Sequence, residues 1–136
     1  MKTAYVLGPI TQHGKEYLPV YKAAMKVCSN HFDSVIGSYP DFWKMKEKPE
    51  NYYSKIMKEI KNCSMLVAEV SKASHGVGIE LQASAESNIP LICLAEKGII
   101  VSSMIRGLPN LKAIVYYDDL QNLEEKLNDK FQHLLF

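Results

Sequence analysis

The sequence lacks the features that would commit it to a membrane or a disulfide framework. No apolar run approaches the roughly 20 residues of a membrane-spanning helix, and the opening MKTAYVLGPI has too short an apolar stretch for a signal peptide. The three cysteines, Cys28, Cys63 and Cys93, show no CxxC pair and no metal-ligand spacing. An odd count without pairing favours a reducing compartment. We therefore expect a cytoplasmic protein.

The sequence also lacks an excess of charge of either sign. It has 16 basic and 15 acidic residues and a net charge of +1, which argues against nucleic acid or a membrane surface as its partner. His13, His31 and His133 have no ligand spacing, so we predict no metal. No cofactor is expected either. No GxSxG motif or Cys/His arrangement supports hydrolysis by a serine or a thiol.

What the sequence does have is an alternation of apolar runs and helical patterns over 136 residues, of which 47% are apolar. Without repeats or linkers, this predicts one domain, 1–136. Strands are expected over 3–8, 33–38, 64–70, 89–95 and 111–117. Helices are expected over 14–32 (broken or entered near Pro19), 49–63, 77–88, 99–107 and 119–135. Strands that are apolar throughout favour a parallel sheet covered on both faces, a doubly wound α/β fold.

In such a sheet, ligands bind at the carboxyl ends of the strands. The loops GPITQHG and SKASHGVG, which follow the first and third strands, should share that edge. The second loop carries Ser71, Ser74, Gly76 and Gly78 before a helix. Small residues at a helix N-terminus favour a bound anion such as phosphate. Glycines also serve ordinary turns, and the loop is neither a Walker motif nor GxGxxG.

Glu80 stands in the first turn of the helix expected over 77–88, among Val77, Ile79 and Leu81. It could simply complement the helix dipole. A carboxylate in apolar surroundings beside an anion loop is also a credible nucleophile or acid/base. His75 is expected to be an exposed loop histidine.

Other candidates have ordinary structural explanations. Ser102, Ser103 and Arg106 could bind an anion, but a capped short helix with one surface arginine explains them as well. Tyr5 in the first strand is by default a packing residue.

The segments LVAEVSKASHGVGIELQAS, PLICL and SSMIRG, in that order and spacing, resemble the 2′-deoxynucleoside 5′-phosphate N-hydrolases of the nucleoside 2-deoxyribosyltransferase superfamily. YVLGPI is similar to the superfamily's opening strand and loop. The resemblance covers most of the chain, most firmly residues 64–107. It implies a Rossmann-like or flavodoxin-like homodimer with a five-stranded parallel sheet flanked by helices. It also implies cleavage of a nucleoside 5′-monophosphate into a free base and a sugar 5-phosphate.

The resemblance assigns roles to particular residues. The family's nucleophilic glutamate falls on Glu80, and its phosphate-holding serine and glycine fall on Ser74 and Gly76. A serine that the partner subunit supplies to the same phosphate falls on Ser102. Residues near the sugar and base fall on Tyr5, Gly8, Pro9 and Ile10. We include Gly78 among the expected substrate-binding residues.

Two positions depart from the family pattern. An aspartate that assists the glutamate is replaced by Ile56, and an arginine of the first loop is replaced by Thr11. If the helix is shifted in the alignment, the nearest acids are Glu59, Glu50 and Asp41. Three readings therefore stay open besides a 2′-deoxynucleotide hydrolase. They are a ribonucleotide hydrolase, since related folds act on CMP; a non-catalytic nucleotide-binding module; and a nucleoside 2-deoxyribosyltransferase.

Overall fold

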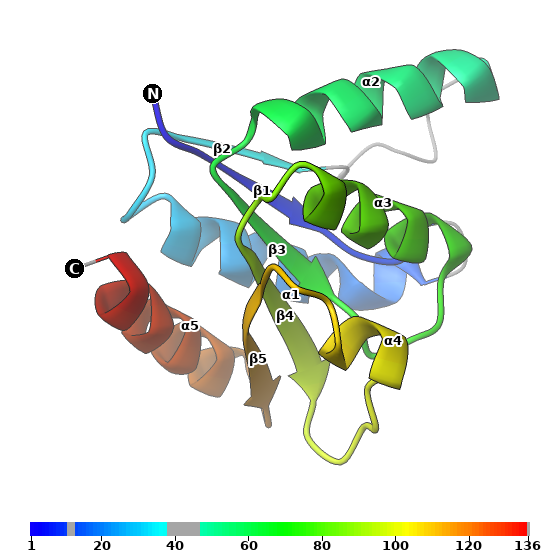
Figure 1. Ribbon diagram of the computed structural model, residues 1–136. Coiled ribbons are helices and arrows are strands. Elements are labelled where there is room, and N and C mark those ends of the chain that lie inside the picture. Colours follow the sequence, from blue (N-terminus) through cyan, green and yellow to red (C-terminus); the bar gives the residue numbers. More distant parts are fainter. Residues whose placement is uncertain (11–12, 38–46, 136) are drawn as a thin grey trace.

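The computed structural model describes residues 1–10, 13–37 and 47–135. The strands of this part of the chain are β1 (Thr3–Leu7), β2 (Ser34–Gly37), β3 (Met65–Glu69), β4 (Leu91–Glu96) and β5 (Leu111–Tyr117). The helices are α1 (Gly14–Cys28), α2 (Pro49–Asn62), α3 (His75–Glu86), α4 (Ser103–Arg106) and α5 (Leu120–Leu135). Strands and helices alternate along the chain (Figure 1).

The five strands form one parallel sheet in the order β2-β1-β3-β4-β5. The fold class predicted from the sequence is therefore confirmed. After β2 the chain returns to the other side of β1, so the order of the strands reverses between β1 and β3. Parallel sheets of this kind bind ligands beside that point, outside the carboxyl ends of the strands.

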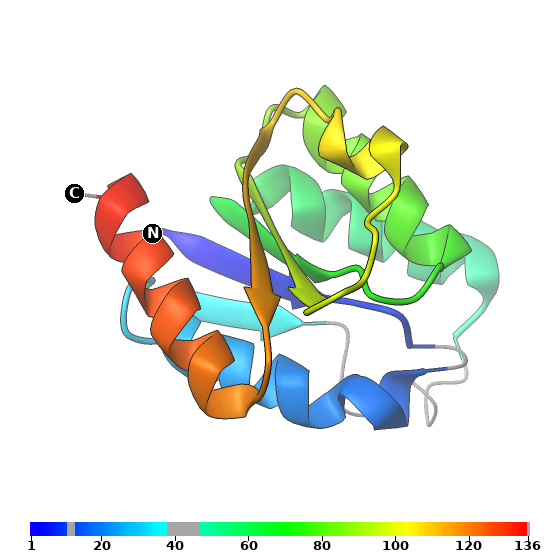
Figure 2. The ribbon, with the colours of Figure 1, turned by 90° about the horizontal axis from the view of Figure 1, so that it is seen from below.

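Helices cover both faces of the sheet (Figure 2). α1 and α5 lie on one face, where the core includes Tyr17, Tyr21 and Phe131. α2, α3 and α4 lie on the other face, above a second core that includes Tyr5, Ile56 and Leu81. Because side chains alternate along a strand, β1 sends Val6 to the first core and Tyr5 and Leu7 to the second.

Several helices differ from their predicted bounds; α1, for example, ends at Cys28 and not at residue 32. α1 runs without a break through Pro19, because a proline in the second turn removes a single backbone hydrogen bond while Tyr17 and Tyr21 pack on the sheet. The helix expected over 99–107 is shorter, Ser103–Arg106. Ser102 caps it by accepting a hydrogen bond from the amide of Met104 at 3.2 Å, which fixes its start.

None of the helices described over 1–10, 13–37 and 47–135 combines the length and the hydrophobicity needed to cross a membrane.

Candidate active site

Two loops meet where the strand order reverses. β1 and β3 are paired neighbours, with Leu7 opposite Ala68, so the segments after them leave the sheet side by side. These segments are Gly8–Ile10 after β1 and Ser71–Ser74 after β3. The described parts of the two predicted loops therefore share the ligand-bearing edge.

The first loop is held close to α1. A Cβ atom on Gly8 would stand 2.5 Å from ring atoms of Tyr21, so only glycine fits there without a shift. The Tyr21 hydroxyl donates a hydrogen bond to the carbonyl oxygen of Pro9 at 2.7 Å, and Ile10 packs partly against the core of that face. Gly8, Pro9 and Ile10 thus form a fixed wall at the edge of the sheet.

The second loop ends in a capped helix. The Oγ of Ser74 accepts a hydrogen bond from the backbone amide of Val77 at 3.3 Å, and the helix begins at His75. Glu80 therefore lies in the second turn of α3; its predicted place in the first turn is wrong, because the Ser74 cap starts the helix two residues earlier than expected. A helix dipole acts mainly within the first turn, so dipole complementation becomes a weaker account of Glu80.

The Glu80 side chain reaches back toward the start of its helix. A Cβ atom placed on Gly76 would lie 4.0 Å from the Oε1 atom of Glu80 and 4.0 Å from the Oγ atom of Ser74. The structure thus brings together the three residues Ser74, Gly76 and Glu80 that the sequence predicts for phosphate and sugar.

Glu80 is partly buried, and burial raises its pKa to about 8, because desolvation disfavours the charged form of a carboxyl group. Burial raises the pKa of Tyr5 and of Tyr52, and the negative charge of Glu80 raises both further. Glu80 lies on α3, which follows β3 at the edge where the strand order reverses. A carboxyl group with a raised pKa in such a place is a candidate for chemistry.

Tyr5 on β1 is buried, and its hydroxyl group is unpaired within the described part of the chain. The side chain has no exposed surface, and its hydroxyl has no hydrogen-bond partner among the described residues. Packing alone does not account for a buried, unpaired hydroxyl, since leaving it unpaired costs free energy.

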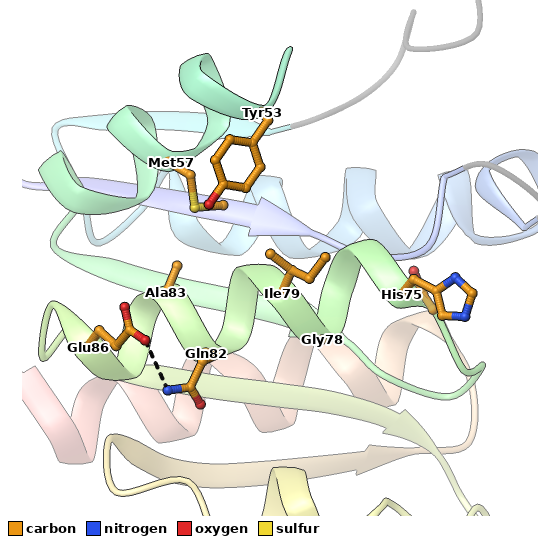
Figure 3. Close-up of a pocket in the computed structure, with 9 residues that line it drawn as sticks. Tyr53, Met57, His75, Gly78, Ile79, Gln82, Ala83 and Glu86 are labelled. Carbon is orange, nitrogen blue, oxygen red and sulfur yellow. Dashed lines mark hydrogen bonds between the residues drawn. The ribbon is translucent and has the colours of Figure 1, made fainter. Parts of the chain in front are cut away.

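Gly78 and His75 line a groove between α2 and α3. Ser74 also lines this groove, with Tyr53, Met57 and Ile79 among the other residues. Figure 3 shows Tyr53 and Met57 on α2 facing Ile79 and Ala83 on α3. No described atom lies within 4 Å of a Cβ placed on Gly78, so the fold itself does not demand glycine there. His75 is exposed, as predicted, but it is the first residue of α3 and not part of the loop.

Ser102 is exposed and caps the short helix α4, on the same face of the sheet as α3 (Figure 2). Arg106 donates a hydrogen bond from its Nε atom to the carbonyl oxygen of Val101 at 3.0 Å. The capped-helix explanation therefore accounts for the ordered contacts of this segment, while the exposed Ser102 hydroxyl stays accessible.

Ile56 lies in the core beneath α2, with 5% of its surface exposed. Of the other acids considered in this region, Glu50 is exposed in the first turn of α2 and Glu59 is partly buried one turn after Ile56. Asp41 and Thr11 lie outside the described residues.

Sequence analysis missed a buried carboxylate at the same edge, on the opposite face of the sheet. Glu69 has no exposed surface. It accepts hydrogen bonds from the Tyr117 hydroxyl at 2.5 Å and from the Ser71 amide. Burial raises the pKa of Glu69, although these hydrogen bonds lower it in part. The lone acid in the apolar run MLVAEV was the available signal.

Among residues 1–10, 13–37 and 47–135, no three side chains of His, Cys, Asp or Glu gather as a metal site would require. The three cysteines are buried and unpaired.

Two curated proteins that carry the same name are similar to this chain. A protein of Methanosarcina mazei named "Putative 2′-deoxynucleoside 5′-phosphate N-hydrolase 1" is 27% identical over 134 residues, which cover 94% of this chain and 83% of the relative. A protein of Syntrophotalea carbinolica with the same name is 39% identical over 72 residues, or 52% of this chain and 50% of the relative. No family model matches the chain.

Solved structures share the fold at low sequence identity. The Clostridium botulinum CMP N-glycosidase BcmB has a TM-score of 0.67 and 17% identity, covering 91% of this chain and 98% of that one. A 2-deoxyribosyltransferase of Bacillus psychrosaccharolyticus also has a TM-score of 0.67, with 19% identity and 90% of each chain covered.

The resemblance inferred from the sequence is thereby confirmed. Over most of its length the chain is similar to proteins named as 2′-deoxynucleoside 5′-phosphate N-hydrolases, and it has the fold of the nucleoside 2-deoxyribosyltransferases.

Proposed function

We propose that this protein is a nucleotide N-glycosidase that hydrolyses (2′-deoxy)nucleoside 5′-monophosphates to a free base and a (deoxy)ribose 5-phosphate. The relatives named as N-hydrolases and the shared fold with a CMP N-glycosidase support the reaction class. The observation that carries the proposal is the placement of Glu80 beside Ser74 and Gly76, at the point where the strand order reverses.

In this proposal the start of α3 holds the 5′-phosphate. The backbone amides near Gly76 and the Ser74 hydroxyl offer hydrogen-bond donors, and the glycine leaves room for an anion. The phosphate is remote from the reacting carbon, so its binding energy holds C1′ against Glu80. Tyr5 and the wall Gly8–Ile10 would contact the sugar and base.

The Glu80 carboxylate attacks C1′ while the N-glycosidic bond breaks, through an oxocarbenium-like state. The electron pair of that bond leaves with the base nitrogen, which takes up a proton from solvent. Water then attacks C1′ of the glycosyl ester and releases a proton to solvent, giving the sugar 5-phosphate and the free carboxylate. One difficult displacement becomes two easier ones, as in retaining glycosidases.

The direct test is base release from a panel of ribo- and deoxyribonucleoside monophosphates and the matching nucleosides, followed by chromatography. We expect release from at least one monophosphate, little from its nucleoside, and near-complete loss in Glu80→Gln. Glu86→Gln removes an exposed carboxylate from the same helix and should keep the activity. Transfer of the sugar to an added base would instead identify a deoxyribosyltransferase.

The proposal includes a homodimer in which Ser102 of the partner subunit contacts the phosphate. Large apolar side chains are exposed around α3 and α4, including Tyr53 (56%), Ile79 (53%) and Met104 (82%). Tyr53 and Ile79 line the groove between α2 and α3 (Figure 3), and exposed apolar side chains of this kind suit a partner of the same chemistry.

Subunit complementation tests the role of Ser102. Glu80→Gln and Ser102→Ala chains are mixed, unfolded and refolded together. If Ser102 acts across the interface, each mixed dimer regains one intact site and the mixture recovers about a quarter of the wild-type activity. If it acts within its own chain, every site keeps one defect and no recovery follows.

The burial of Ile56 favours a second candidate, a nucleotide-binding module without catalysis. A side chain in the core can neither donate nor accept a proton, so no assisting acid stands at that position. Tight nucleotide binding by calorimetry without base release from any member of the panel would support this alternative.

A further inference from the structure

The loop that leads from β3 into α3 is anchored at Ser71. The backbone amide of Ser71 donates a hydrogen bond to the Oε1 atom of Glu69, and its hydroxyl oxygen accepts one from the backbone amide of Glu96 at 2.8 Å. The amides of residues 72–74 donate to no described residue. Among the described residues, the hydrogen bonds of Ser71 are therefore the last that hold the loop before the capped start of α3.

Glu69 is itself held from another strand. It is the last residue of β3 and has no exposed surface. Its Oε2 atom accepts a hydrogen bond at 2.5 Å from the hydroxyl of Tyr117, the last residue of β5. Each carboxylate oxygen thus has a donor, one from the loop and one from β5. A buried carboxylate is costly without such partners, so this pairing favours one position of the side chain.

The same hydrogen bonds connect the loop to α1. Glu96, whose amide donates to Ser71, accepts a hydrogen bond at 3.0 Å from the hydroxyl of Tyr17 on α1. One turn later, Tyr21 of the same helix donates to the carbonyl oxygen of Pro9. The two loops of the candidate site are therefore connected through α1, on the face of the sheet opposite to α3.

The anchored residue lies close in the chain to the proposed phosphate site. Ser74, three residues after Ser71, caps α3 by accepting a hydrogen bond from the amide of Val77 at 3.3 Å. We propose that Glu69 is a positioning residue: through the Ser71 amide it fixes the loop that forms the proposed phosphate site. Small displacements of groups that bind a substrate weaken its binding and its orientation. This inference rests on the proposed role of the loop in phosphate binding.

Glu69→Met tests the proposal, because methionine has a similar size but offers the Ser71 amide no oxygen acceptor. We expect the Ser71 amide to exchange its hydrogen with solvent about tenfold faster, while the amide of Val67 within β3 keeps its rate. In the base-release assay, KM for the best monophosphate should rise about fivefold. The slow turnover of the matching nucleoside, which has no phosphate, should not change.

Glu69→Gln is the conservative variant. Glu69 forms no ion pair with a described residue, so hydrogen bonds account for its described contacts. The glutamine oxygen can accept from the Ser71 amide, and its NH2 group can donate to the Tyr117 oxygen. Amide exchange and KM should both stay near the values of the wild type. A full effect in Glu69→Gln would mean that the charge matters and not the hydrogen bond, and would overturn the proposal.

Tyr117→Phe is the matched control for stability. It removes the β5 partner of Glu69 but leaves the hydrogen bond to Ser71. We expect a less stable protein in which KM and the exchange of the Ser71 amide relative to that of Val67 are unchanged. Equal changes in Tyr117→Phe and Glu69→Met would mean that the loop merely follows overall stability, which contradicts a positioning role.

Three further results would overturn the proposal. They are an unchanged Ser71 amide in Glu69→Met, an unchanged KM in that variant, and failure of both Glu69→Met and Glu69→Leu to fold, which would make Glu69 a residue of stability alone. Amide exchange is measured by NMR without substrate. Failure of the proposed hydrolysis therefore appears separately, as a lack of base release by the wild type.

Discussion

A methyl group on Gly76 would stand 4.0 Å from the Oε1 atom of Glu80. The backbone that we propose for the phosphate and the carboxyl group that we propose for C1′ therefore border one small space. Because 4.0 Å is an ordinary van der Waals distance, the fold itself tolerates a methyl group at position 76. A requirement for glycine there would therefore come from a bound ligand.

Gly76→Ala should therefore fold normally and lose function. The added methyl group meets no backbone, and alanine favours a helix over glycine by about 1 kcal/mol, so we expect an unchanged or higher Tm. It would fill space needed by the phosphate, raising KM for the best monophosphate by about tenfold or more. Gly78→Ala tests the other glycine of this helix that the sequence predicts to bind substrate. A similar rise in KM for Gly78→Ala would place the substrate in the groove between α2 and α3.

Gly8→Ala should destabilise the fold. Its Cβ atom would stand 2.5 Å from the buried ring of Tyr21, whose hydroxyl is tied to Pro9. Overpacking of this kind costs roughly 1–3 kcal/mol. Urea unfolding measures this loss, and Gly78→Ala, where nothing lies within 4 Å, should show none. An unaffected Gly8→Ala protein would mean that Tyr21 moves freely.

Glu80→Gln should stabilise the fold at neutral and alkaline pH. The pKa of Glu80 is raised to about 8 in the folded protein, so between its ordinary value and pH 8 the folded state binds more protons than the unfolded state. The stability of the wild type then falls as the pH rises through this window. Glutamine carries no charge, so the variant avoids the free-energy cost of holding a carboxylate in a poorly solvated place, which is roughly 1–3 kcal/mol.

The measurement is Tm against pH for Glu80→Gln, the wild type and Glu86→Gln. The gain in Glu80→Gln should be small well below the ordinary glutamate pKa of 4.5, where both states carry a neutral carboxyl group, and largest at and above pH 8. Parallel curves for all three proteins would contradict the raised pKa. A stabilised but inactive variant is what an active-site carboxylate predicts.

The same pKa predicts the pH dependence of catalysis. Only the carboxylate form of Glu80 can attack C1′, so kcat/KM should rise with pH along an acid limb centred near pH 8, as set by the free protein. Rates for one monophosphate between pH 5 and 9 give the profile. A limb near pH 4.5 would show that Glu80 is better solvated than the structure indicates.

The sequence predicted the sheet and the main parts of the site for clear physical reasons. Strands such as 64–70 are apolar on both faces, which only a covered parallel sheet explains, and the topology then places the loops after β1 and β3 together. The start of α3 was predicted two residues late, because a serine before two glycines reads as loop until its side chain is seen to cap the helix. The pairing of Glu69 with Tyr117 joins positions 48 residues apart, and no local pattern encodes it.

That pairing gives a last prediction, on stability. Tyr117 donates to the buried Glu69 at 2.5 Å, and Tyr117→Phe leaves this carboxyl group with the amide and the side chain of Ser71 as nearby donors. The loss should cost roughly 1–3 kcal/mol. Because the lost hydrogen bond favours the charged form, the pKa of Glu69 rises further in the variant, so the loss should grow as the pH rises.

Tyr116→Phe alters the neighbouring residue, which is partly buried against the other core, and serves as the control. Urea unfolding at pH 5 and pH 8 measures both variants. Equal losses for the two variants, or a larger loss at pH 5 for Tyr117→Phe, would show that the hydrogen bond to Glu69 does not stabilise this edge of the sheet.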